Sequence, residues 1–224
     1  MSIQKPVPPP RRGRGRPPKI TPDRVIEATM SLLEDKAPDE ISMAEVAARL
    51  SVPVMSLYNH YPNTSVLLQA VADHSFGQFR MPRTAADAPW QTALLDWLRE
   101  LARHCDRHPV ALRIMSIEGR ATPAWRKILS PLLAVLQGTG VDDQHASLLL
   151  AWITSQALGL IYIEEFADPA RRLAQLTTPA LAEDTPYLAT LNQRLPEVQR
   201  QQVLALGFQA MVDGLEAHLQ RLLK

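Results

Sequence analysis

One short stretch of the chain carries side chains whose types and spacing suit contacts with DNA. Val54, Met55, Ser56, Tyr58 and Asn59 would lie at the exposed start of a short helix. Hydroxyl and amide groups there can meet phosphate oxygens, and amide or apolar groups can meet base edges. Because phosphate contacts position a protein and base contacts specify the sequence, this set predicts recognition of double-stranded DNA through the major groove.

Two helices joined by a tight turn would hold that stretch in place. Ser42 with Glu45 three residues later is a capping-box pattern that starts the first helix. Pro53 suits the first turn of the second helix, expected at about Val54–Tyr61. The first helix has one apolar face, formed by Met43, Val46, Ala47 and Leu50. The second helix is too short to be stable alone, so residues 41–64 predict a helix-turn-helix supported by neighbouring helices.

The run Leu57-Tyr58-Asn59-His60-Tyr61, followed by Asn63 and Leu67-Leu68, resembles the recognition helix of the tetracycline-repressor (TetR) family and the residues after it. The resemblance covers roughly residues 19–80, including a first helix at Thr21–Glu34. Over the rest of the chain, only length and helical character match. The resemblance implies an all-α protein with a three-helix, helix-turn-helix head and a larger helical C-terminal domain for ligand binding and dimerisation.

Three positions depart from that family pattern. Ser51 stands where the turn usually has glycine, Thr64 where a lysine is usual, and Ala44 where a basic residue is frequent. Two cationic contacts with DNA are therefore in doubt. The candidate DNA-binding residues of the head are Ser42, Met43, Val54, Met55, Ser56, Tyr58, Asn59, His60 and Thr64.

The segment before the head is basic and proline-rich. Residues 1–20 contain six Lys or Arg and no acid, and the run Arg12-Gly13-Arg14-Gly15-Arg16-Pro17 resembles an AT-hook. Glycines let the backbone lie on the floor of a narrow A·T minor groove, where guanidinium groups are attracted. The alternative is a solvated basic tail. If the arm is a hook, its contacts are Arg12, Arg14, Gly15, Arg16, Pro17 and Lys19.

The balance of charge makes this arm important. The chain has 24 basic and 23 acidic residues, so removing the arm's six basic residues leaves 18 against 23. Residues 21–80 alone have four basic and eight acidic residues, a net charge of −4. An acidic head must gain its affinity for phosphates from local placement, helix N-termini and the arm. We therefore divide the chain into a disordered arm (1–18), a DNA-binding domain (19–80) and a ligand-binding and dimerisation domain (87–224).

Composition and compartment signals fit a cytoplasmic helical protein. Hydrophobic residues make up 46% of the chain, and Cys105 is its one cysteine, which excludes an intramolecular disulfide. The basic N-terminus lacks the apolar run of a signal peptide. Ala146–Ile163 is apolar but is short for a bilayer and flanked by acids, so we expect a buried core helix. Further helices are expected at Asn63–Phe79, Trp90–His108, 109–119, 123–137 (broken or bent at Pro131), 142–167 and 196–223, with a loop at 177–196.

Two rows of small residues predict a homodimer. They recur along one face of each of the last two long helices and would let helices approach closely. The alternative is close packing inside one subunit. The expected interface residues are Ser147, Ala151, Ser155, Gly159, Gly207, Ala210, Gly214 and Ala217.

The four tryptophans all lie outside the head, and three of them are candidates for an apolar ligand cavity with a few polar groups. The alternative is that each of these residues is simply core. His104 and His108 are one helical turn apart, but no third ligand is near in sequence, so we expect no metal or cofactor. The cavity candidates are Trp97, Leu101, His104, Met115, Trp125, Trp152, Gln156, Tyr162 and Phe166.

Motifs for catalysis are missing from the sequence: there is no glycine-rich phosphate loop, no Gly-x-Ser-x-Gly and no Cys-x-x-Cys. We therefore expect no enzyme. We expect a transcriptional regulator, a ligand-responsive repressor that binds a palindromic operator as a homodimer and responds to a small apolar or aromatic compound. The alternative is a constitutive architectural DNA-binding protein without an effector.

Overall fold

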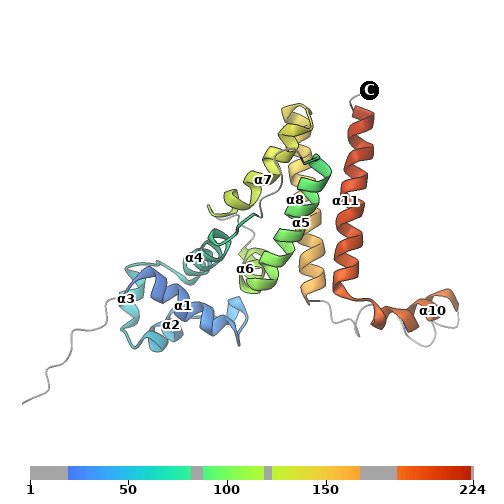
Figure 1. The fold of residues 1–224 in the computed structure, drawn as a ribbon. Coiled ribbons are helices and arrows are strands. Elements are labelled where there is room, and N and C mark those ends of the chain that lie inside the picture. Colours follow the sequence, from blue (N-terminus) through green and yellow to red (C-terminus); the bar gives the residue numbers. More distant parts are fainter. Residues whose placement is uncertain (1–19, 82–87, 119–122, 167–185, 223–224) are drawn as a thin grey trace, which may run out of the picture.

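A computed structural model of the chain describes residues 20–81, 88–118, 123–166 and 186–222, and every regular element in these ranges is helical (Figure 1). This confirms the all-α prediction. A small head built from α1 to α3 joins a larger helical body through α4. The elements are α1 (Pro22–Leu33), η1 (Pro38–Glu40), α2 (Met43–Leu50), α3 (Val54–Tyr58), α4 (Thr64–Gly77), α5 (Trp90–Arg107), α6 (Pro109–Glu118), α7 (Trp125–Gly138), α8 (Asp143–Phe166), α10 (Pro186–Arg194), η3 (Leu195–Glu197) and α11 (Arg200–Leu222).

The head is held together by one small apolar core. Val25 of α1, Val46 of α2, Leu57 of α3 and Val71 of α4 are all fully buried. The helix ends are capped by nearby side chains: Thr21 accepts a hydrogen bond from the backbone N–H of Arg24 at 3.4 Å. Such caps satisfy N–H groups that have no partner within the helix. Burial of Leu57 ties the short α3 to the longer helices, which is the support that its length requires.

Helix α4 belongs to both parts of the molecule. Its first half packs against α1, and its second half packs against α6 and α7 of the body. Phe76, near its C-terminal end, is almost fully buried. A movement of α4 relative to the body must therefore displace either head or body contacts.

The long helices α5, α8 and α11 run side by side in the body, with α7 packed on α5 and α8 (Figure 1). The indole Nε1 of Trp97 donates a hydrogen bond to the carbonyl of Ile128 at 2.7 Å, which fixes α5 against α7 in the core. Helix α7 continues through Pro131, so of the two expected outcomes, a break or a bend, the break is wrong. Leu132 and Leu136, both buried, hold that helix on the core in spite of the backbone N–H that proline lacks.

Two further expectations need correction. Part of the expected loop at 177–196 is the helix α10, in which Pro186 occupies the first position, where a missing N–H costs little. Helix α8 is buried on one face only: Ile153, Ala157 and Ile161 are fully buried, whereas Leu148 is 63% exposed. By length and composition α8 alone, among the described residues, passes as a membrane-spanning candidate. Its inner face packs against α5, α7 and α11, while 22% of its apolar window is buried.

Candidate functional site

The helix-turn-helix forms as the residue pattern predicted. The Ser42 Oγ accepts a hydrogen bond from the N–H of Glu45 at 3.3 Å, and the Glu45 Oε2 accepts one from the N–H of Ser42 at 3.1 Å. Lys36 forms an ion pair with the same carboxylate. The hydrogen bond and the opposite charge raise the pKa of Lys36 and lower the pKa of Glu45. The start of α2 is thus fixed by contacts within the head.

The turn between α2 and α3 uses a left-handed residue that is not glycine. Ser51 has φ 56° and ψ 44° at the C-terminal end of α2, and its N–H bonds to the carbonyl of Ala48 at 3.0 Å. The next N–H, that of Val52, bonds to the carbonyl of Ala47 at 3.0 Å. Side chains other than glycine adopt this conformation at a cost, so the departure at Ser51 leaves strain in the turn.

Most predicted contact residues share one exposed surface. Met55 is 68% exposed and Tyr58 is 44% exposed, while Leu57 between them is buried. Asn59 and His60 are exposed, and Ser42 is exposed at the start of α2. Val54, Ser56 and Thr64 are half-buried at the edge of the same region. A short helix that exposes these groups can enter a groove with its N-terminal residues first.

Met43 is the exception. The sequence predicted that it touches DNA, but only 4% of it is exposed, because it lies on the apolar face of α2 in the core of the head. The same periodicity that predicts the core face also places it there. Met43 therefore supports the fold of the head rather than its DNA-binding surface.

The basic residues of the head make contacts of their own. Arg49 donates a hydrogen bond to Ser31, Lys36 pairs with Glu45, and Arg80 donates to the carbonyls of Gly77 and Phe79 at 2.9 and 2.7 Å. Each would have to leave or share its partner to bind a phosphate. The arm contacts, Arg12, Arg14, Gly15, Arg16, Pro17 and Lys19, lie outside the described residues.

Comparison with known proteins agrees with this geometry. Residues 25–71, which include the helix-turn-helix, match the family described as bacterial regulatory proteins, tetR family. The head is thus similar to the DNA-binding domain of the TetR family. It is 26% identical over 221 residues to the transcriptional repressor DrrR1 of Streptomyces coeruleorubidus, and the match covers 92% of this chain and 81% of that protein. It is 24% identical over 202 residues to the class A tetracycline repressor of transposon 1721 from Escherichia coli, covering 88% and 91% of the two chains.

A solved structure shares the fold. The TetR-family protein ActR of Streptomyces coelicolor, solved in complex with actinorhodin, aligns with a TM-score of 0.73 and 21% sequence identity. The alignment covers 90% of this chain and 99% of ActR. The matches over the head and along most of the chain confirm the TetR resemblance of the sequence, and they support a DNA-binding transcriptional regulator.

The body of the protein contains a buried histidine in aromatic surroundings. His104 on α5 is 1% exposed, and its ring centre lies 5.4 Å from Phe79 and 6.2 Å from Phe76. Neither ring nitrogen forms a hydrogen bond of good geometry with the described residues. Burial, and then the charges of His108 and Arg107, lower the pKa of His104 to about 4, with slight opposition from the backbone of Ser75. His104 is therefore neutral at physiological pH and able to accept or donate a hydrogen bond.

Several cavity candidates do surround this histidine. Trp97, Leu101 and Trp125 are buried in the same core, and Phe76 of α4 meets Trp125 edge-on at 5.3 Å between ring centres. Met115 on α6 is half-buried against that core. This half of the candidate set thus lies where α4 enters the body.

The remaining candidates do not join them. Trp152, Gln156 and Tyr162 are exposed on the outer face of α8, and Trp152 lines a groove with Leu149 and Leu215 instead. The error arose because α8 is apolar all round, so its inner and outer faces could not be separated by composition. The side chain of Phe166 lies outside the described residues. His104 and His108 have ring centres 4.6 Å apart, and no group of three metal-ligating side chains occurs in the described ranges.

One contact between head and body was missed by sequence reasoning. The Oδ1 of Asp73, on α4, accepts a hydrogen bond from the backbone N–H of Ala124 at 2.6 Å, just before α7 begins. The carboxylate therefore caps α7 from another helix, where it also suits the helix dipole. A side chain that caps a helix 51 residues away leaves no local pattern in the sequence.

The small-residue rows lie on outer faces of the last two long helices. On α8, Ser147, Ala151, Ser155 and Gly159 are all exposed in the single chain. On α11, Ala210, Gly214 and Ala217 are also exposed. Gly207 is different: a Cβ there would lie 2.4 Å from the Cδ2 of Leu160, so this glycine serves the contact of α11 with α8 inside the chain. Gly207 is half-buried, and its place at a dimer interface stays a prediction.

Proposed function

We propose that the protein is a cytoplasmic, ligand-responsive repressor that binds a palindromic operator as a homodimer. The observation that carries this proposal is that one helix, α4, packs on α1 of the head and also places Phe76 in the aromatic core around His104. DrrR1 is named as a repressor, and ActR has been solved with the compound actinorhodin. The role needs no catalytic step.

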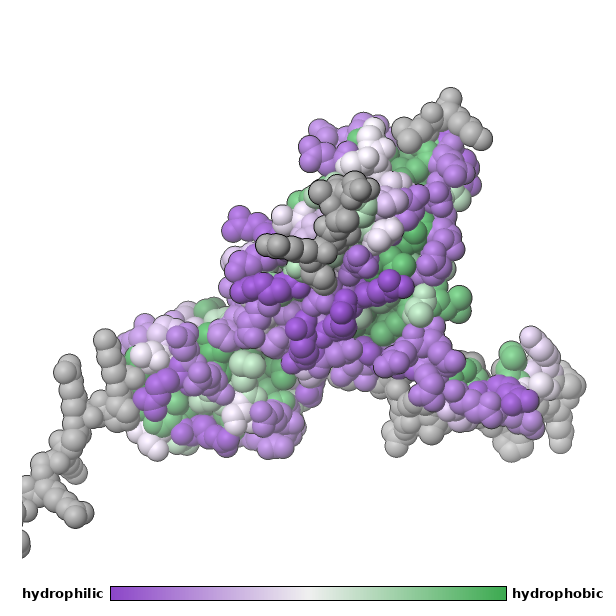
Figure 2. All heavy atoms as spheres, viewed as in Figure 1, coloured by the Kyte–Doolittle hydropathy of each residue, from purple (hydrophilic) through white to green (hydrophobic). Residues whose placement is uncertain are grey.

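A homodimer is supported by the outer faces of α8 and α11. Alongside the exposed small residues, these faces carry large apolar groups that no described part of the chain covers: Leu148, Trp152, Ile163 and Leu206. Figure 2 shows hydrophobic surface on the part of the body where α11 lies. Monomeric proteins rarely expose such a patch. A second copy would cover it and would supply a second head for the second half-site, about 34–36 Å away or a multiple of that.

The effector site that we propose is the core around His104. A neutral imidazole among Phe76, Phe79 and Trp125 offers one polar partner in apolar surroundings. Ligand sites commonly combine such a wall with a few well-placed polar groups. We therefore propose a small, mainly apolar or aromatic effector with one hydrogen-bonding group directed at His104.

Signal transfer then follows from the contacts of α4. A ligand beside Phe76 would displace the body half of α4 and change the separation of the two recognition helices. Asp73 holds α4 to the start of α7 and so defines the position from which α4 moves. The ligand needs only to bind the state with low DNA affinity more tightly, and couplings of about 1–3 kcal/mol are usual.

The arm is proposed as a second DNA contact. Its six basic residues are the largest concentration of positive charge in the sequence, whereas the head is net acidic. We propose that Arg14 and Arg16 lie in an A·T minor groove beside each half-site, as an AT-hook would.

The test measures operator binding by fluorescence anisotropy on DNA from upstream of the protein's own gene, with and without a panel of aromatic compounds. We expect sequence-specific binding that at least one compound weakens. Asp73→Ala should change the effect of that compound by a factor of about 2–30, because coupling residues contribute about 0.5–2 kcal/mol. Asp73→Asn keeps an acceptor oxygen and should behave as wild type. Specific binding that no compound alters, in any variant, would instead indicate a constitutive DNA-binding protein.

A further inference from the structure

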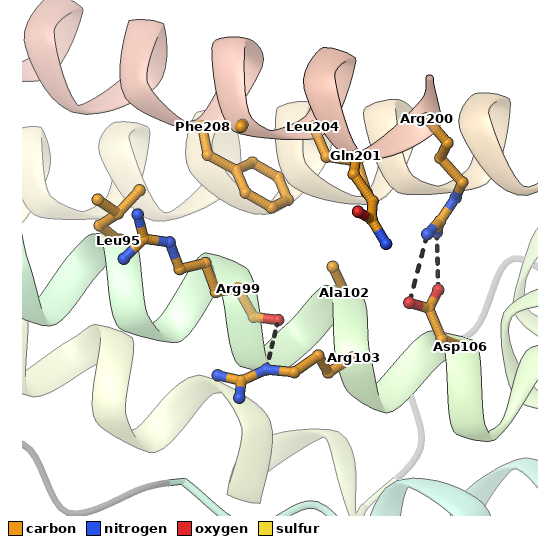
Figure 3. A pocket seen from close by; sticks show the side chains of 10 residues that line it. Leu95, Arg99, Ala102, Arg103, Asp106, Arg200, Gln201, Leu204 and Phe208 are labelled. Carbon is orange, nitrogen blue, oxygen red and sulfur yellow. Dashed lines mark hydrogen bonds and ion pairs between the residues drawn. The ribbon is translucent and has the colours of Figure 1, made fainter.

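A groove between α5 and α11 forms a cavity that is separate from the core around His104 (Figure 3). Its volume is about 420 Å³, which falls within the range of about 300–1,000 Å³ that small-molecule pockets occupy. Its lining contains none of the residues of the proposed effector core. The groove thus needs an explanation of its own.

The floor of the groove is apolar. Phe208 and Leu204 point down from α11, and Ala102 and Leu95 face them from α5 (Figure 3). Ala205, which is exposed, completes the α11 side. An alkyl chain or an aromatic ring would bury its surface on this floor, which is favourable at about 25 cal/mol per Å² of apolar area.

The rim is basic. Arg99 and Arg103 stand on α5, and the Nε of Arg103 donates to the carbonyl of Arg99 at 3.4 Å. At the far end Arg200 is paired with Asp106 at 2.7 Å. Arg200 is also the first residue of α11, so the positive end of that helix dipole lies at the same rim. Charge at this rim therefore favours an anion.

Two of these arginines can change partner at little cost. Arg99 lies 3.8 Å from Asp96, beyond hydrogen-bonding distance, with both groups partly exposed. Arg103 pairs with the buried Glu100 at 3.2 Å, but Arg107 also binds Glu100. If Arg103 turned toward a ligand, Glu100 would keep Arg107 as partner and no buried charge would be left unpaired.

We propose that this groove binds an amphipathic carboxylic acid with an alkyl or aromatic body. The body lies on Phe208, Leu204 and Ala102, and the carboxylate lies between Arg99 and Arg103. Since guanidinium groups bind carboxylates with two parallel hydrogen bonds, two arginines one helical turn apart give a specific site. The bound acid joins α5 to α11 and holds these two helices together. This binding does not depend on the proposed effector site or on DNA.

The test titrates the full-length protein with octanoate and with uncharged 1-octanol by calorimetry. Octanoate should bind more tightly than octanol, and only octanoate binding should weaken as salt is raised. The double variant Arg99→Gln/Arg103→Gln should weaken octanoate binding about tenfold or more, because charge-assisted hydrogen bonds are removed. The matched control Arg126→Gln/Lys127→Gln removes two exposed cations from α7 and should bind as wild type.

A blocking variant locates the site independently of charge. Ala205→Trp places a ring over the groove from an exposed position, so it should abolish octanoate binding while circular dichroism stays unchanged. The proposal is overturned if wild type binds no octanoate, or if the blocked or double arginine variant binds it as tightly as the control. Binding that survives in the blocked variant would place the acid in another cavity.

Discussion

The head and the body satisfy their polar groups in different ways. In the head, the side chains that cap helices lie three residues from their partners and are exposed: Ser42 with Glu45, and the Asn63 Oδ1 with the N–H of Val66 at 2.9 Å. In the body, several polar contacts join distant segments and are buried or half-buried. The Trp97 indole reaches a carbonyl 31 residues away, and His104 is buried without a hydrogen bond of good geometry.

This difference explains how one part can read DNA while the other responds. Local caps keep the shape of the head even when α4 moves, so its recognition surface stays formed. The polar contacts of the body depend on the positions of whole helices, so a bound compound or a proton can alter them. Substitutions in the two parts should therefore have different consequences.

The largest effect is expected at the outer faces of α8 and α11. Gly214→Leu should give monomers and abolish specific operator binding, because a bulky side chain prevents close approach of a second copy and overpacking costs about 1–3 kcal/mol or more. Nothing lies within 4 Å of a Cβ at Gly214, so the fold of a single chain should tolerate the change. Analytical ultracentrifugation measures the outcome, with Gly138→Leu, equally open at the end of α7, as control. Normal dimers of the Gly214 variant would remove this face from the interface.

Deleting residues 1–18 should have the next largest effect. The deletion removes five basic residues from each chain (Lys5, Arg11, Arg12, Arg14 and Arg16), so affinity should fall strongly while helicity stays unchanged. Each phosphate that is no longer neutralised should reduce the slope of log K against log salt by about 0.9. Anisotropy titrations at several salt concentrations measure this slope. An unchanged slope would show that the arm does not touch phosphates.

The third prediction concerns the effect of low pH on stability through His104 in the body. His104 has a pKa of about 4 in the folded protein, against about 6.5 when exposed in the unfolded chain. Because the pKa of His104 is depressed in the folded protein, the free energy of unfolding keeps its full value above pH 6.5 and decreases as the pH falls toward 4. From pH 7.5 to pH 5 the loss should be about 2 kcal/mol.

Urea unfolding at those two pH values measures it. His104→Gln should remove most of the pH dependence, and His60→Gln, on the exposed surface of the head, should leave it intact. An equal pH dependence in the His104 variant would mean that other groups in the body carry the effect.

The smallest effect is expected in the turn of the head. Ser51→Gly should stabilise the protein by up to about 1 kcal/mol, because glycine adopts the observed φ of 56° without steric cost. Thermal unfolding measures the change, and Ser56→Gly, within α3, should destabilise instead. A lower melting temperature for the Ser51 variant would indicate that the serine side chain stabilises the turn by more than the backbone strain destabilises it.

The sequence predicted more of the head than of the body, and the reason is physical. Caps, turns and amphipathic periodicity act over three or four residues, so Ser42, Pro53 and Leu57 could be assigned from their neighbours. Periodicity even contradicted the assignment of Met43 to DNA, since it lay on the apolar face of α2.

The body depends on contacts between distant helices. The way the helices pack brings Asp73 to Ala124 and keeps Trp152 apart from Trp97. Neither result can be predicted from the residues next to them in the sequence. The groove between α5 and α11 was missed for the same reason, because its arginines look like an ordinary solvated face of α5.

The most direct test of the central claim is selection of bound sites from random double-stranded DNA by the full-length protein. A dimeric regulator that reads DNA through α3 should enrich an inverted repeat, with half-site centres about 34–36 Å or a multiple apart. Met55→Ala should change the preferred bases within each half-site, since Met55 is the most exposed apolar group of that helix. Enrichment of A·T-rich DNA without two-fold symmetry, unchanged by Met55→Ala, would contradict the account.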